Sequence, residues 1–124
     1  MESLCVFCGS GSGAKAGYAE AARAFGEAIA SRNLALVYGG SDIGLMGIVS
    51  SAVRDAGGRV TGVIPKRIAD NVKGQTGIAL EVVPDMHTRK ARMYALSDAV
   101  VVLPGGIGTM DEFFETWEIG RAHV

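Results

Sequence analysis

The stretch "LALVYGGSDIGLMGIVSSAVRDAGGRVTGVIP", residues 34–65, holds a complete strand–helix–strand unit. Short apolar runs at 34–38 and 59–65 predict strands, and the apolar spacing across 44–56 predicts a helix between them. The Gly57-Gly58 pair supplies a natural C-terminal cap for that helix. Both runs are nearly continuous rather than alternating, which is typical of parallel strands covered by helices on both faces.

The same alternation of apolar runs and helical patterns continues on both sides of this unit. Polar residues 66–78 predict a loop or short lid, and Asp85 is a candidate helix cap. We therefore expect one α/β domain over residues 1–117, a Rossmann-like doubly wound parallel sheet with helices on both faces. The remaining predicted elements are strands at 4–7, 79–83 and 99–103, and helices at 18–29, 85–97 and from Thr109.

Bulk composition limits the classes of partner. The chain has 124 residues, enough for one modest domain, and 48% of them are apolar. A net charge of −1 gives no electrostatic footprint for nucleic acid or an anionic membrane. The first residues lack a basic signal-peptide region, and no apolar run approaches a membrane span of about 20 residues. With two cysteines and no disulfide framework, we expect a cytoplasmic protein.

Glycine is unusually frequent, with 18 residues grouped mainly in four clusters. Three of these clusters, 9–13, 39–47 and 105–108, follow predicted strands, where open α/β sheets bind their ligands. The last cluster precedes two acids in "LPGGIGTMDEFFE", and its backbone amides can form an anion-binding nest. Thr109 and Glu112 also match a capping box, so Glu112 either serves a ligand or caps its own helix.

Two further motifs allow several interpretations. Gly9, Gly11 and Ala14 fit a weak dinucleotide fingerprint, but the next strand ends in glycine rather than an acid, which disfavours a dinucleotide. A Walker A loop is also excluded, because no Gly-Lys-Ser/Thr follows, and a flexible turn is the alternative. Cys5 and Cys8 would point to opposite faces of a strand, so neither redox chemistry nor zinc binding is expected. We expect no metal and no cofactor.

Cations near a helix start form the other candidate site. In "DMHTRKARM", Arg89 and Lys90 oppose the helix dipole, so they are either a pair facing an anionic ligand or two solvated side chains. His87 is expected at the surface or near the cap rather than as a base. Gly39 and Gly40 either expose amides to a phosphate or base, or make a tight strand-to-helix connection.

Together these blocks resemble one family. "PGGIGTMDE" matches the P-G-G-x-G-T-x-x-E signature of the LONELY GUY proteins, phosphoribohydrolases often labelled lysine decarboxylase-like. The blocks "CVFCGSGSG", "YGGSDIGLMG", "GGRVTGVIP" and "MHTRKARM" follow the family's order, and the resemblance covers 4–117. It implies a Rossmann-like homodimer that hydrolyses the N-glycosidic bond of N6-isoprenylated adenosine 5′-monophosphate. The products are the free base and ribose 5-phosphate.

The resemblance also assigns site residues by motif position. The catalytic pair falls on Arg89 and Glu112, where a carboxylate suits the oxocarbenium-like state of ribosyl cleavage. Asn71 departs from the glutamate that members often carry in the lid, and Ser41 interrupts a longer glycine run. The resemblance places substrate contacts at Lys90, Gly105, Gly106, Ile107, Gly108, Thr109, Met110 and Asp111. The glycine turn after the second predicted strand adds Gly39 and Gly40 as substrate-binding candidates.

Two other functions remain open: a hydrolase of plain adenosine monophosphate or other purine nucleotides, and a non-catalytic nucleotide or cofactor carrier. Arg89 together with Glu112 favours an enzyme, because a carrier needs the glycine nest but not the carboxylate.

The resemblance stops after Trp117. The last residues, "IGRAHV", correspond in one reading frame to a widely used sequencing adapter. We therefore expect residues 118–124 to be a non-native tail, and at least one βα unit of the domain to be missing.

Overall fold

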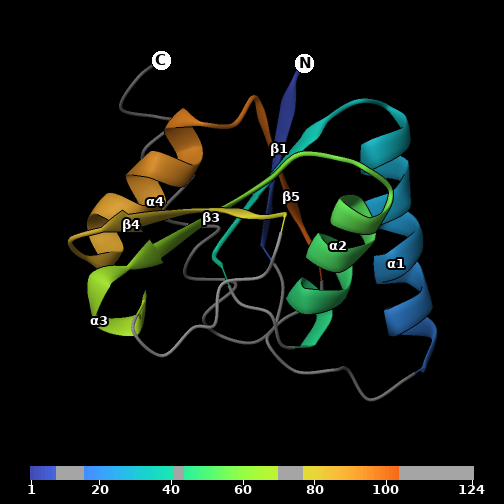
Figure 1. Ribbon diagram of the computed structural model, residues 1–124, viewed down its shortest axis with the longest axis horizontal. Helices are drawn as coiled ribbons and strands as arrows, with labels where there is room; N and C mark the ends of the chain where they lie inside the picture. Colours follow the sequence, from blue (N-terminus) through green and yellow to red (C-terminus); the bar gives the residue numbers. More distant parts are fainter. Residues whose placement is uncertain (8–15, 41–43, 70–76, 104–124) are drawn as a thin grey trace.

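In the computed structural model, five parallel strands form one sheet in the order β4-β3-β2-β1-β5 (Figure 1). The structure describes residues 1–7, 16–40, 44–69 and 77–103, so the predicted tail at 118–124 lies outside it. The Rossmann-like α/β fold expected from the sequence is confirmed. The elements are β1 (Ser3–Phe7), α1 (Ala16–Ser31), β2 (Ala35–Tyr38), α2 (Gly44–Asp55), β3 (Val60–Pro65), α3 (Lys66–Ala69), β4 (Ala79–Val83), α4 (Met86–Ala95) and β5 (Ala99–Val102).

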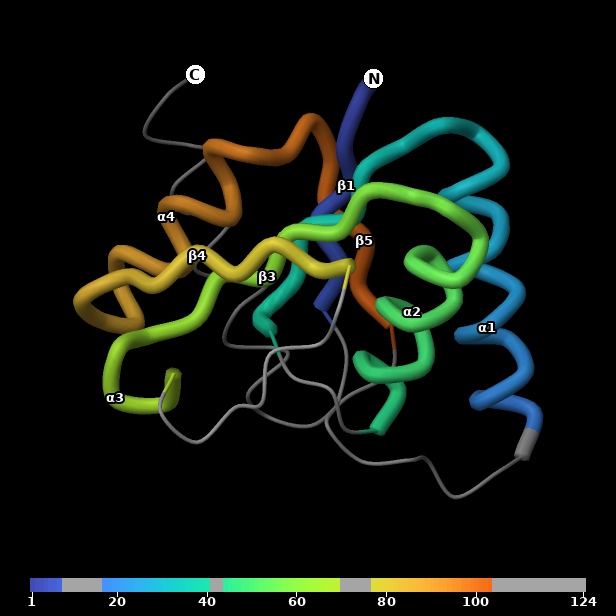
Figure 2. Tube along the Cα trace, viewed as in Figure 1, coloured from blue at the N-terminus to red at the C-terminus, as the bar shows by residue number. Residues whose placement is uncertain are grey.

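The direction of the strand order reverses at β1. Strands β2, β3 and β4 add successively on one side of β1, and β5 then pairs with its other side, with Leu4 opposite Ala99 (Figure 2). Because such crossovers are right-handed, the reversal places α4 on the face opposite α1 and α2 (Figure 1). The carboxyl ends of β1 and β5 therefore form the topological switch point where this fold class binds ligands.

The predicted helix ends agree with the structure. After α2, Gly57 has φ of 81°, and the N–H of Gly58 donates to the Val53 carbonyl at 2.8 Å. This is a Schellman cap, as the glycine pair indicated. Asp85 is extended, and its carboxylate accepts from the Thr88 N–H at 2.7 Å as the N-cap of α4.

One predicted loop is partly wrong. Residues 66–69 form the short helix α3 directly after Pro65, whereas the sequence predicts a loop or short lid over all of 66–78. Lysine, arginine and alanine favour helix, and this local preference decides a four-residue turn that carries no usable periodicity. Residues 70–76 lie outside the described part.

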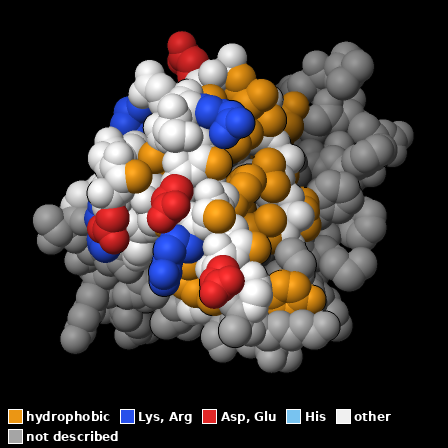
Figure 3. Space-filling model, turned by 90° about the vertical axis from the view of Figure 1, so that its right-hand side faces the viewer, with side chains coloured by type: hydrophobic (Ala, Val, Ile, Leu, Met, Phe, Trp, Pro, Cys, Tyr) orange, Lys and Arg blue, Asp and Glu red, His pale blue; other side chains and the backbone are white. Residues whose placement is uncertain are grey.

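Apolar side chains are buried on both faces of the sheet. On the α1/α2 face, Gly26 lets the two helices touch, since a Cβ there would lie 2.7 Å from the Val49 carbonyl oxygen. The α1/α2 side of the surface mixes acidic, basic and apolar side chains, without a field of one sign over its described part (Figure 3). Within the described ranges, no helix is long and apolar enough to cross a membrane.

Candidate functional site

The guanidinium of Arg89 lies between Gly39, directly after β2, and Val63 within β3. Its Nε donates to the Val63 carbonyl at 3.0 Å, and its Nη2 donates to the Gly39 carbonyl at 3.1 Å. Its Nη1 contacts the Met86 sulfur at 3.7 Å. The arginine thus joins α4 to two strands at the edge of the sheet where ligands bind in this fold class.

The strand register explains why these carbonyls accept from Arg89. β2 and β3 pair as far as Tyr38 opposite Gly62. The residues that follow this last pair are Gly39 and Val63, and each of their carbonyls accepts a hydrogen bond from Arg89. Arg89 therefore satisfies backbone acceptors at the point where the paired segment of β2 ends.

Glycines allow the chain to come this close. A Cβ on Gly39 would lie 1.8 Å from Nη2 of Arg89. Gly40 has φ of 85°, a left-handed conformation that favours glycine. A Cβ on Gly62 would lie 3.0 Å from the Gly40 Cα. The predicted glycine turn after β2 is therefore tightly packed against β3 and Arg89.

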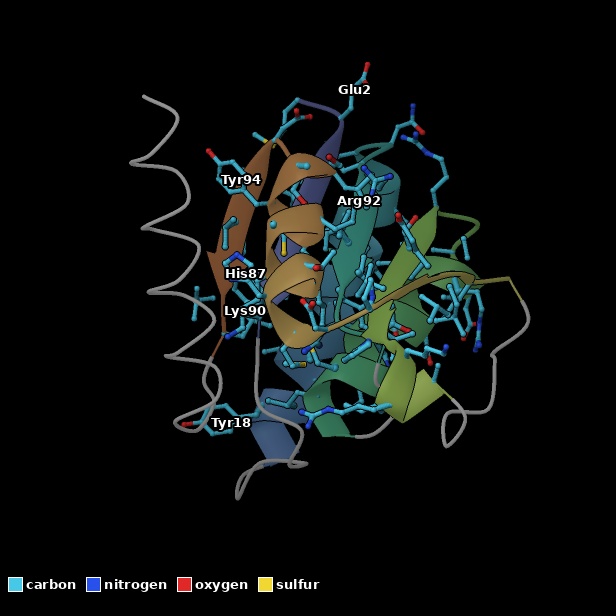
Figure 4. All side chains as sticks on the ribbon, turned by 90° about the vertical axis from the view of Figure 1, so that its left-hand side faces the viewer. Glu2, Tyr18, His87, Lys90, Arg92 and Tyr94 are labelled. Atoms are coloured by element: carbon cyan, nitrogen blue, oxygen red, sulfur yellow. The ribbon has the colours of Figure 1, made fainter. Side chains whose placement is uncertain are left out.

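Lys90 lies on a different side of α4. Neighbouring helix positions point about 100° apart, so Arg89 and Lys90 cannot share one direction. Lys90 is buried, with 6% of its surface exposed, and lies on the same side of α4 as His87 and Tyr94, opposite Arg92 (Figure 4). The alternative of two solvated cations is therefore wrong. His87 is exposed, as the sequence analysis expected.

The carboxylate of Asp85 fixes the start of the helix that carries both cations. Hydrogen bonding from Thr88, first from its backbone N–H, holds the pKa of Asp85 below its ordinary value. The charged carboxylate is also favourable at a helix N-terminus, where it offsets part of the repulsion that two early cations experience.

The other half of the predicted site lies outside the described residues. This applies to Glu112, to the loop 105–111, and to Asn71, Ser41 and Cys8. Their roles stay predictions. Among the described residues, no group of three or more His, Cys, Asp or Glu side chains could hold a metal ion.

Two contacts of Arg89, with Met86 and with Val63, were not predicted from the sequence. Met86 lies three residues before Arg89, a spacing that brings helical side chains together and was a usable signal. Val63 contributes through its backbone carbonyl, for which a side-chain motif offers no signal.

Solved structures share this architecture. The X-ray structure of the structural-genomics target TM1055 is 28% identical, with a TM-score of 0.76 over 97% of this chain and 71% of that one. A molybdenum cofactor binding protein from Rippkaea orientalis matches with a TM-score of 0.77 at 24% identity, over 95% of this chain and 72% of that one. At this identity, the second likeness shows the fold alone.

Curated relatives are closer in sequence. The cytokinin riboside 5′-monophosphate phosphoribohydrolase LOG3 of Arabidopsis thaliana is 50% identical over 117 residues, which is 92% of this chain and 54% of the relative. The chain thus spans about half the length of the curated relatives it matches. The family model described as "possible lysine decarboxylase" matches residues 46–124. The resemblance to the LONELY GUY proteins is confirmed, and the chain belongs to the family described as possible lysine decarboxylases.

Proposed function

We propose that this protein is a phosphoribohydrolase. It hydrolyses the N-glycosidic bond of an N6-substituted, cytokinin-type adenosine 5′-monophosphate and releases the free base and ribose 5-phosphate. The 50% identity to enzymes named for this reaction supports the proposal, as does the motif pair Arg89 and Glu112. A homodimer in the cytoplasm is part of the same proposal.

The observation that carries the proposal is the setting of Arg89. Three of its N–H groups are engaged by Val63, Gly39 and Met86. A guanidinium has five N–H donors, so one remains on each terminal nitrogen after the contacts among the described residues. Two such donors suit the paired oxygens of a phosphate or carboxylate. An anchored cation at the carboxyl edge of the sheet is therefore able to bind an anion.

The chemistry follows from the charges. Loss of the base leaves positive charge on the ribose, which a carboxylate stabilises directly or through an oriented water molecule. In our proposal Glu112 has that role, and the amides of 105–108 hold the 5′-phosphate and so fix the sugar. Arg89 keeps Glu112 ionised and oriented, or binds the phosphate.

Replacing Glu112 with Gln tests this role. Either glutamate or glutamine can occupy the N3 position of a capping box, so the change removes the charge and retains the cap. We expect base release to fall at least about 100-fold, in line with loss of a transition-state electrostatic contact. Nucleotide binding, measured by calorimetry, should change little. Normal turnover by Glu112→Gln would leave Glu112 only its capping role.

The two alternatives are separated by substrate. The purified protein is incubated with plain and with isoprenylated adenosine monophosphate, and free base is measured by chromatography. Release from the isoprenylated nucleotide alone supports the proposal, and equal release from both identifies a general nucleotide hydrolase. Binding without release identifies a carrier. The likeness to the molybdenum cofactor binding protein shows a shared fold and does not favour the carrier.

A further inference from the structure

Gly39 is a glycine without a conformational need for one. Four described glycines, among them Gly40 and Gly57, have positive φ, and Gly39 is not one of them. What distinguishes Gly39 is its neighbour. The three atoms nearest to a Cβ placed on it all belong to the Arg89 guanidinium and its Nε, at 1.8, 3.0 and 3.6 Å. The missing side chain at position 39 therefore makes room for Arg89.

The backbone of the same residue also binds the arginine. The Gly39 carbonyl accepts from Nη2 at 3.1 Å, and the Val63 carbonyl accepts from Nε at 3.0 Å. One carbonyl directly after β2 and one within β3 fix the plane of the guanidinium, and the Met86 sulfur lies against its third nitrogen. With that plane fixed, the remaining N–H groups have a defined direction.

We infer that Gly39 is a positioning residue for Arg89. Its absent side chain and its carbonyl together hold the guanidinium between the end of β2 and Val63 within β3. The sequence predicts that Gly39 binds substrate, whereas the inferred role acts through the arginine. The consequence for turnover rests on the proposed function, but the placement of the guanidinium does not.

The principal test is Gly39→Ala. A new methyl group should displace the flexible end of Arg89 rather than the backbone, so the fold is retained and the thermal midpoint changes little. A misplaced catalytic cation should lower kcat/KM by roughly 10- to 100-fold. Gly17→Ala is the matched control, because a Cβ at Gly17 has no atom within 4 Å, and its kcat/KM should be unchanged.

A double-mutant cycle with Arg89→Ala separates positioning from any independent role of Gly39. If Gly39 acts through the guanidinium, adding Gly39→Ala to Arg89→Ala should change nucleotide affinity and residual rate by less than about twofold. The same loss in both backgrounds would overturn the inference. If Gly39→Ala alone does not fold, the double variant decides. Folding of the double variant supports the inference, because shortening Arg89 makes room, and failure of both variants overturns it.

A readout without substrate keeps this inference distinct from the proposed function. In protein labelled with ¹⁵N-arginine, the Nε–H signal of Arg89 is identified by its loss in Arg89→Lys. Its hydrogen bond to Val63 should slow its exchange with water. Gly39→Ala should shift the signal or speed its exchange, and Gly17→Ala should do neither. An unaltered signal in Gly39→Ala overturns the inference, whereas lack of base release by the unmodified protein overturns only the proposed function.

Discussion

The two helical layers that cover the sheet are built differently. On one face, α2 is largely apolar and packs directly on α1 through Gly26, with seven of its residues buried. On the other face, α4 buries only Lys90 and Met93. Several of its described contacts are directional, among them the Asp85 cap, the carbonyl contacts of Arg89, and an ion pair between Arg92 and Glu81 at 2.6 Å. One layer stabilises the fold, and the other positions charged groups.

This difference between the two layers predicts which helix unfolds locally at the lowest free energy. Local stability follows buried apolar contact. In the described part of the chain, Met93 is the one buried apolar side chain of α4, whereas α2 has several. The exposed ion pair of Arg92 with Glu81 adds at most about 1 kcal/mol. We therefore expect α4, which carries Arg89, to loosen at a lower free energy than α1 and α2.

The largest effect is expected from Met93→Ala. Met93 is fully buried and is the only buried apolar side chain of the described α4, so its loss should cost about 3 kcal/mol of unfolding free energy. Met46→Ala on α2 is the matched control and removes the same atoms from the other layer. Urea unfolding gives the total cost, and amide exchange shows its location. We expect exchange to rise selectively in α4 for Met93→Ala, and a uniform rise would contradict the contrast between the layers.

A smaller effect is expected from Gly26→Ala. The added Cβ would meet the Val49 carbonyl and the Ala52 Cβ, each at 2.7 Å, so the two helices must separate. Overpacking of about 1–3 kcal/mol exceeds the gain of about 1 kcal/mol in helix propensity. Gly17→Ala in the same helix meets nothing and should gain stability. If thermal unfolding finds both variants equally stable, the close contact of α1 and α2 at Gly26 does not contribute to the stability of this layer.

The smallest effect concerns Asp98, between α4 and β5. Its carboxylate accepts from the backbone N–H groups of Glu2 at 2.6 Å and Ser3 at 3.2 Å, and these bonds lower the pKa of Asp98. A lowered pKa means that the stabilisation is complete above the ordinary value of 3.8 and is lost as pH falls below it. Asp98→Asn should therefore lower the thermal midpoint slightly at neutral pH and flatten its decline in acid.

The control for this pH dependence is Asp55→Asn, which removes an exposed carboxylate beside Arg54. It should leave the acid decline as it is in the unmodified protein. An Asp98→Asn curve that superimposes on this control would show that the carboxylate does not secure the start of β1.

Sequence predicted the elements better than it predicted their contacts. Parallel strands buried on both faces must be apolar, so a run such as 59–65 was recognised as a strand. The Gly57 and Asp85 caps have side-chain signatures. Strand order depends on distant pairings that no local pattern records. The carbonyl partners of Arg89 are backbone atoms, and any residue at position 63 would supply one.

The pairing of β1 with β5 also bears on how the chain is made. Ser3 and Asp98 meet across 95 residues of sequence, so β1 leaves the ribosome long before its second neighbour exists. At bacterial to eukaryotic synthesis rates, that interval is about 5–20 s. Throughout it, one side of β1 is a strand edge with unpaired amides and carbonyls, open to other nascent chains. β1, an inner strand of the described sheet, is thus exposed to wrong pairing for much of its synthesis.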